Sequence, residues 1–93
     1  SDLLSILELA RARETTAELL DELGLDAYLF EVEPHDDQWE LKVDCAVETA
    51  GAWESVTLSV PKEMLLASRD AAIHRRLLAE WRGRLGACRL RAS

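Results

Sequence analysis

The densest group of side chains able to do chemistry lies in one short segment, Glu33-Pro34-His35-Asp36-Asp37. A histidine beside three carboxylates could hold a divalent metal ion or transfer protons. The spacing matches no calcium loop, however, and turns collect aspartate because its side chain bonds to nearby backbone groups. We interpret the segment as a turn without a metal ion, and keep a small enzyme using carboxylates around His35 as an alternative.

Other signs of catalysis are weak. The chain has no CxxC, no HExxH and no glycine-rich phosphate loop, so the sequence predicts neither a catalytic residue nor a cofactor. His74 has no acid–base partner that the sequence identifies, and we interpret it as a helix-surface residue. The two cysteines do not make a disulfide framework or a zinc site by themselves, and a bridge between them is possible but has no support in the sequence. Cys45 falls on the apolar side of a strand, which predicts a buried free thiol, and Cys88 falls in the tail.

Three segments in the middle of the chain have the pattern of strands: residues 27–33, 38–48 and 53–60. Apolar side chains alternate with polar ones in each, which is typical of antiparallel strands with one face on a core and one face in water. The turns between them are residues 34–37 and 49–52. The predicted inward residues are Tyr28, Phe30 and Val32, then Trp39, Leu41, Val43, Cys45 and Val47, then Val56, Leu58 and Val60.

Helices are predicted before and after these strands. Residues 2–23 carry apolar side chains at helical spacing, and Gly24 can end that helix in the left-handed conformation. Two capping boxes are present, Ser5 with Glu8 and Thr15 with Glu18, and the second predicts a kink near Thr15 or two short helices. The apolar face expected there consists of Leu3, Ile6, Leu7, Ala10, Ala17 and Leu20, turning towards Leu19 and Leu23.

At the C-terminal end, residues 62–67 are expected to form a short helix or turn. Ser68 is the expected N-cap of a helix over 69–85, which Gly86 ends. Residues 87–93 are expected to be a mobile tail or a short added strand. The predicted buried stripe of the last helix is Ile73, Leu77, Leu78, Trp81 and Leu85.

These elements predict a single α+β domain over residues 1–93, with a two-layer α-β-β-β-α order and both helices on one face of a three-stranded antiparallel meander. Over residues 2–85 this order resembles that of double-stranded RNA-binding domains. Those domains present a lysine cluster at the start of the last helix, whereas this helix starts Ser68-Arg69-Asp70. The first helix is acidic and would repel phosphate. No RNA-contact residue is therefore transferred, and a family is not identified.

Charge is distributed unevenly around a formal net charge of −7. Residues 1–61 contain 15 acidic and three basic residues, whereas residues 62–93 contain three acidic and eight basic residues. An arginine-rich end could grip an anionic partner, since the guanidinium suits phosphate and carboxylate. It could equally pair with the protein's own acids or be solvated. Nine arginines against two lysines are typical of a GC-rich bacterial genome.

Trp53 is the one tryptophan that breaks the strand pattern, because the inward residues of its strand are even-numbered. It is expected on the open face of the sheet unless a bulge at Ala52 or Glu54 turns it inward or it packs over the rim by Leu29. Tryptophan is frequent at binding hot spots. We therefore predict a non-catalytic protein-binding module, an accessory or regulatory protein acting through complementary charged surfaces. The predicted partner-binding residues are Trp53, Arg75, Arg76, Arg82 and Arg84.

The sequence also leaves other functions open. Nucleic-acid binding by the arginine-rich last helix is the alternative function, and mimicry of nucleic acid by the acidic front half is a weaker one. The partner is expected to be another protein of unknown identity, with homodimerisation through a sheet edge as a second kind of contact. No apolar run could span a bilayer and the N-terminus does not have the pattern of a signal peptide, so a cytoplasmic location without membrane contact is expected.

Overall fold

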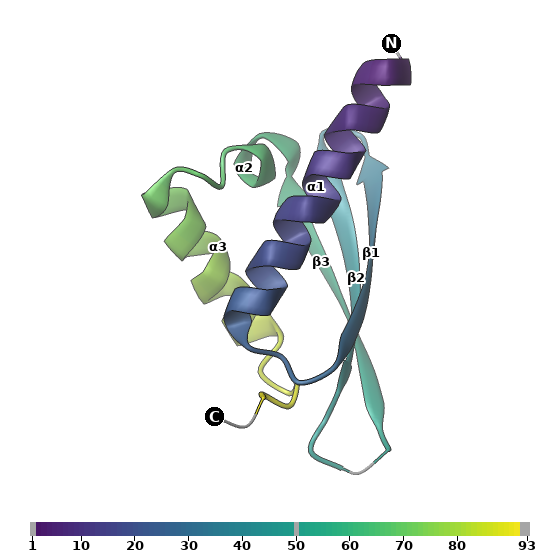
Figure 1. The fold of residues 1–93 in the computed structure, drawn as a ribbon, viewed down its shortest axis with the longest axis vertical. Coiled ribbons are helices and arrows are strands. Elements are labelled where there is room, and N and C mark those ends of the chain that lie inside the picture. Colours follow the sequence, from purple (N-terminus) through teal and green to yellow (C-terminus); the bar gives the residue numbers. More distant parts are fainter. Residues whose placement is uncertain (1, 50, 92–93) are drawn as a thin grey trace.

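The computed structural model describes residues 2–49 and 51–91, with side chains from residue 5 onward. The elements follow in the order α1 (Asp2–Leu23), β1 (Tyr28–His35), β2 (Gln38–Ala46), β3 (Trp53–Pro61), α2 (Lys62–Leu66) and α3 (Ala71–Arg84). The three strands form one sheet, and Figure 1 shows the helices gathered on one side of it. The predicted α+β architecture is confirmed.

The sheet is an antiparallel meander in the order β1-β2-β3. Its register runs without interruption from Tyr28 opposite Cys45 to His35 opposite Gln38, and from Gln38 opposite Pro61 to Ala46 opposite Trp53. Because side chains alternate between faces, this register places all the odd-numbered residues of β2 on the helix side. The predicted inward residues Trp39, Leu41, Val43 and Cys45 are all buried.

α1 differs from its prediction in two ways. It runs unbroken through Thr15 to Leu23, so the two short helices expected there do not form. Its buried face consists of Ala12, Thr16, Leu19, Leu20 and Leu23, whereas Ile6, Leu7 and Ala10 are exposed and Ala17 is only half-buried. The stripe expected from the sequence was therefore wrong in its N-terminal half, where α1 extends past the layer that α2 and α3 provide (Figure 1). The side chain of Leu3 lies outside the described residues.

The last helix packs as predicted but starts later. Leu77, Trp81 and Leu85 are buried against the sheet side of the core, with Ile73 and Leu78 packed beside them. The N-cap is Asp70, whose carboxylate accepts hydrogen bonds from the backbone N–H groups of Ala72 and Ile73. Ser68, the predicted cap, is buried in the connection between α2 and α3.

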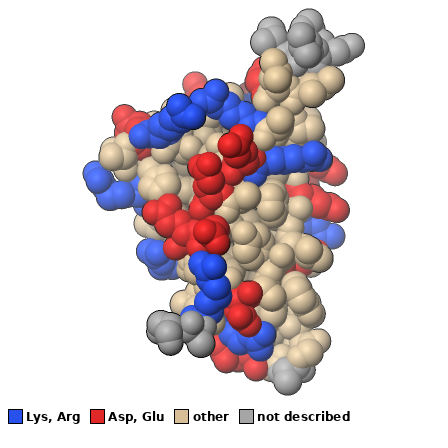
Figure 2. Space-filling view, in the orientation of Figure 1, with Lys and Arg blue, Asp and Glu red and all other residues tan. Residues whose placement is uncertain are grey.

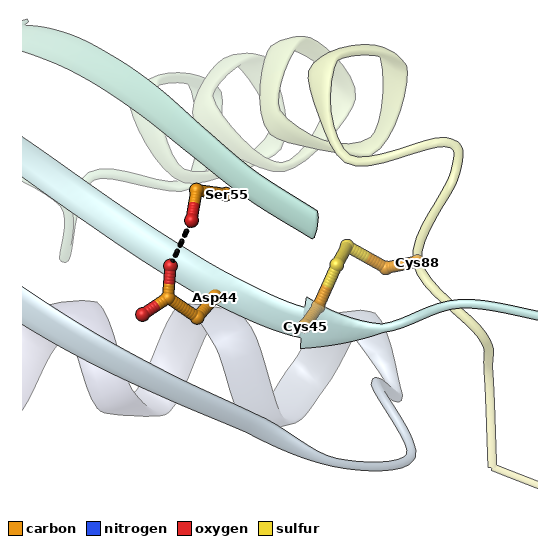
Figure 3. Close-up of a disulfide and its surroundings, with 4 residues drawn as sticks. All are labelled: Asp44, Cys45, Ser55 and Cys88. Atoms are coloured by element: carbon orange, nitrogen blue, oxygen red, sulfur yellow. Dashed lines mark hydrogen bonds between the residues drawn. A yellow bond between two sulfur atoms is a disulfide. The ribbon is translucent and has the colours of Figure 1, made fainter. Parts of the chain in front are cut away.

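A disulfide joins Cys45 on β2 to Cys88 beyond α3, across 43 residues of sequence (Figure 3). The free buried thiol expected at Cys45 was therefore wrong. Both cysteines are buried in the core cluster. The bond anchors the segment after α3 to the central strand, which changes the interpretation of that segment as well.

Residues 88–91 are held against the domain, so the expected mobile tail does not occur in the described part of this segment. Single β-bridges pair Cys88 with Val47 and Leu90 with Leu25. Arg89 lies between two segments far apart in sequence: its N–H donates to the carbonyl of Ala46 and its carbonyl accepts from the N–H of Asp26. The alternative of a short added strand is closer to what forms. Residues 92 and 93 lie outside the described residues.

Candidate partner-binding surface

The sheet face away from the helices is open. Strand alternation puts Leu29, Glu31 and Glu33 of β1 on this face, beside the even-numbered residues of β2 and the odd-numbered residues of β3. In the described part of the chain all three helices lie on the other side (Figure 1). Two large apolar side chains stand out there: Leu29 is 67% exposed and Trp53 is 54% exposed.

The position of Trp53 follows from the register. It begins β3 directly opposite Ala46, and the pairing continues residue by residue to Pro61 without a bulge. A bulge would have turned the indole inward. Because the pairing has none, the indole is exposed on the open face. The other two tryptophans, Trp39 and Trp81, are buried as predicted. Trp53 is therefore the tryptophan available to a partner.

The open face is mainly acidic. Glu31 faces Lys42 across β1 and β2, which is a favourable pair of opposite charges. Glu33, however, lies directly opposite Glu40, an arrangement of like charges that costs stability. In the row next to Lys42, on the side away from Glu40, the Ser55 hydroxyl donates to the Asp44 carboxylate (Figure 3). A complementary partner surface would be basic around an apolar anchor point.

Two arginines of the C-terminal segment bind the protein's own acids. The Arg89 guanidinium lies 2.6 Å from an Asp26 carboxylate oxygen, and that of Arg91 lies 3.2 Å from an Asp21 oxygen. Arg91 also donates to the Asp21 carbonyl at 2.8 Å. Internal pairing, one of the three interpretations of the arginine-rich end, therefore holds for Arg89 and Arg91.

The predicted arginines of α3 do not join Trp53 in one site. α3 packs on the helix side of the sheet, whereas Trp53 projects from the opposite face. Arg75, Arg76 and Arg82 are exposed and form no ion pair with any residue that the structure describes. Figure 2 shows the helix side, where acidic side chains form a group along the middle and basic ones lie around it.

Arg84 is the exception among the four α3 arginines. Its guanidinium reaches the outer edge of β3 and donates to the carbonyl of Thr57 at 2.9 Å. Arg84 is thus bound to β3 at Thr57, four residues after Trp53. This contact connects the helix layer to the sheet edge, and only a partner wrapping around that edge could touch both Trp53 and the α3 arginines.

The groups first considered for chemistry are dispersed or paired. Glu33, His35, Asp36 and Asp37 are exposed around the first hairpin, where Asp36 has a φ of 58°. No three histidine, cysteine or acidic side chains lie close enough to hold a metal ion anywhere in residues 2–49 and 51–91. His74 Nε2 lies 2.7 Å from a Glu22 carboxylate oxygen, a partner 52 residues away that sequence reasoning missed.

An open groove lies between α1 and the α2–α3 connection, lined among others by Leu7, Arg11, Glu18 and Arg69.

No helix of the described chain has the length and apolarity required to cross a bilayer. Comparison of the chain with models of protein families, with curated proteins and with solved structures finds no match.

Proposed function

We propose that this chain is a non-catalytic protein-binding module whose partner docks on the open face of the sheet. The observation that carries the proposal is the exposed indole of Trp53 on an uncovered, acidic sheet face. A large aromatic side chain gives a partner more buried area than any other residue type, and it does so with few rotatable bonds. Its exposure in the isolated chain is a cost that a bound partner would remove.

The charges around Trp53 define the chemistry of the proposed partner. Glu31, Glu33, Glu40 and Asp44 share this face with a single lysine, Lys42. A lysine- or arginine-rich surface with an apolar group at its centre is complementary to it. Such complementarity raises the association rate and sets specificity. It would also relieve the repulsion between Glu33 and Glu40.

The test is affinity capture on the immobilised chain, with nuclease-treated lysate of its source organism. Trp53→Ala should weaken the capture of proteins bound to the wild-type chain by roughly 30-fold or more, the loss expected for a hot-spot residue. Ser59→Ala, on the same strand and face, is the matched control and should leave the yield unchanged. Arg75→Glu/Arg76→Glu, on the other side of the sheet, should also leave the yield unchanged. If Trp53→Ala retains the wild-type set, the proposed docking face is wrong.

A second candidate function, binding of nucleic acid, is favoured by one observation: Arg75, Arg76 and Arg82 are exposed on one helix without ion-pair partners among the described residues. Binding of a nucleic-acid duplex should then weaken steeply with salt, because each neutralised phosphate releases counterions. Arg75→Glu/Arg76→Glu should abolish it, whereas Trp53→Ala should not. The two candidates therefore predict opposite responses to the two variants.

The disulfide bears on where the module acts. Disulfides persist in oxidising compartments and are rare in a reducing cytosol. The Cys45–Cys88 bond therefore favours an oxidising compartment over the cytoplasm expected from the sequence. The test is to isolate the chain in the presence of an alkylating reagent, which traps free thiols, and to count the alkylated cysteines by mass spectrometry. Two alkylated cysteines would support the cytoplasm, and none would support the oxidising compartment.

A further inference from the structure

The two edges of the sheet differ in what their backbone groups can bind. In an antiparallel ladder, opposite residues alternate between pairs that exchange hydrogen bonds and pairs that do not. The phase of each ladder is given by one backbone bond at its end. The Ala46 N–H donates to the Ala27 carbonyl beside the β1–β2 ladder, and the Val47 N–H donates to the Ala52 carbonyl beside the β2–β3 ladder. Continuing the alternation along β1 and β3 identifies the residues whose N–H and C=O groups point away from β2. They are Tyr28, Phe30 and Val32 on β1, and Trp53, Ser55, Thr57 and Ser59 on β3.

The outer edge of β3 is capped by the protein itself. The Thr57 carbonyl, one of the groups that point outward, accepts the hydrogen bond from Arg84. A guanidinium in the middle of an edge blocks the approach of another strand, which is one way that proteins protect such edges. β3 is therefore a poor site for strand addition.

The outer edge of β1 has no such cap. Among the described residues, none bonds to the outward N–H or C=O groups of Tyr28, Phe30 and Val32. Pro34, which lacks an N–H, lies on the same edge but only at its end, where proline is tolerated. The rings of Tyr28 and Phe30, 6.3 Å apart, stay half-buried beside this edge. An eight-residue strand with unpaired backbone and half-covered aromatics is ready to accept another strand.

We propose that β1 pairs antiparallel with β1 of a second copy, about a two-fold axis at Phe30, to form a continuous six-stranded sheet. A two-fold interface requires a surface that is complementary to itself, and β1 meets this condition in one register. Centred on Phe30, the pairing sets Phe30 opposite its equivalent and Tyr28 opposite Val32 of the second copy. All three outward N–H groups then find a carbonyl, and the two Phe30 rings meet on the helix side.

Neighbouring registers are less favourable than the one centred on Phe30. Centring on Glu31 sets Glu31 opposite its own equivalent and Tyr28 opposite Pro34, which has no N–H to donate. Centring on Val32 sets Glu31 opposite Glu33. The Phe30 register avoids these problems. Leu29, 67% exposed in the single chain, lies opposite Glu31 of the second copy, and Tyr28 lies opposite Val32, which has an N–H. Registers centred nearer the start of β1 form fewer pairs.

This dimer goes beyond the proposed function and does not depend on it. Pairing along β1 joins the open faces of the two copies into one surface that carries two Trp53 side chains, one on each far strand. A partner with two basic sites could then bind both, and linking two sites raises avidity without new contacts.

The first test is sedimentation equilibrium on the full oxidised chain, with amide hydrogen exchange measured at low and high protein concentration. We expect a dimer whose outward amides at Tyr28, Phe30 and Val32 gain protection as concentration rises. The outward amides of Ser55 and Ser59 on β3 are internal controls and should stay fast. A monomer at high concentration, or a dimer in which the β1 amides remain as fast as these controls, overturns the proposal.

Paired variants test the register without disturbing the core. Leu29→Glu places a carboxylate opposite Glu31 of the second copy twice per dimer, whereas Leu29→Lys places an opposite charge there. The Glu variant should dissociate roughly 2- to 30-fold more readily than wild type, and the Lys variant less readily than the Glu variant. Ser59→Glu and Ser59→Lys are matched controls, because Ser59 faces Glu40 within its own chain just as Leu29 faces Asp44. Equal effects at the two positions would refute the β1 interface.

Discussion

Reduction of the Cys45–Cys88 disulfide should lower the free energy of unfolding by about 4 kcal/mol while the native fold persists. The bond closes a loop between residues 43 positions apart. In the chain-entropy description such a cross-link removes about 2.1 + 1.5R ln n cal/mol/K from the unfolded chain, which for n of about 43 amounts to roughly 4 kcal/mol at 25 °C. Domains of this size have only about 5–10 kcal/mol of stability.

The assay is urea-induced unfolding of the oxidised and the reduced chain, followed by tryptophan fluorescence. Trp39 and Trp81 report unfolding because both indoles are buried in the native state. The reduced chain should unfold at a lower urea concentration and with a larger dependence on urea, since an unfolded chain without the cross-link exposes more surface. Reduction keeps both sulfur atoms in place, so the measured loss excludes the cavity that alanine substitutions would create.

The native fold should survive reduction because the C-terminal segment has other anchors. Its backbone bonds to Ala46 and Asp26 and its ion pair at Arg89 do not depend on the sulfur atoms. The double variant Cys45→Ala/Cys88→Ala is the control and should lose slightly more stability than the reduced chain. Oxidised and reduced forms that unfold within about 1 kcal/mol of each other would refute the argument that this bond acts on the unfolded chain.

Two further predictions use the same unfolding measurement. Asp70→Ala removes the carboxylate that accepts from two N–H groups of α3, and should cost about 1 kcal/mol, whereas Ser68→Ala should cost less; the reverse order would show that the helix starts at Ser68. Glu33→Lys replaces a like-charge pair with Glu40 by an attractive one and should stabilise the chain by a few tenths to about 1 kcal/mol. Its control, Glu31→Lys, creates a repulsive pair with Lys42 and should destabilise it; two shifts of the same sign would contradict the register.

The sheet and its two faces could be predicted from the sequence because a strand has a period of two. Once Trp39, Leu41, Val43 and Cys45 are recognised as one buried face, the opposite face follows from alternation. The exposure of Trp53 required the structure as well, because only the observed register shows that no bulge turns it inward. Local turn and cap chemistry was similarly informative at Gly24, whose φ of 79° is the left-handed conformation that ends α1.

Helix faces were less predictable. α1 has apolar residues on more than one side, and hydrophobic spacing cannot tell which side will be covered. The chosen stripe through Ile6 and Ala10 is exposed because α2 and α3 reach only part of the helix, and the buried one passes through Ala12 and Thr16.

Local features could therefore be predicted from the sequence: the class of each element and the alternation of the strands. The side on which Trp53 lies needed the observed register, and which distant residues meet depends on the tertiary structure alone. Cys45 and Cys88, Arg89 and Asp26, and Glu22 and His74 are each more than 40 residues apart and share no periodic pattern. Their proximity depends on how α3 and the segment after it fold back across the sheet. That same return separates the α3 arginines from Trp53 and leaves the edge of β1 uncovered.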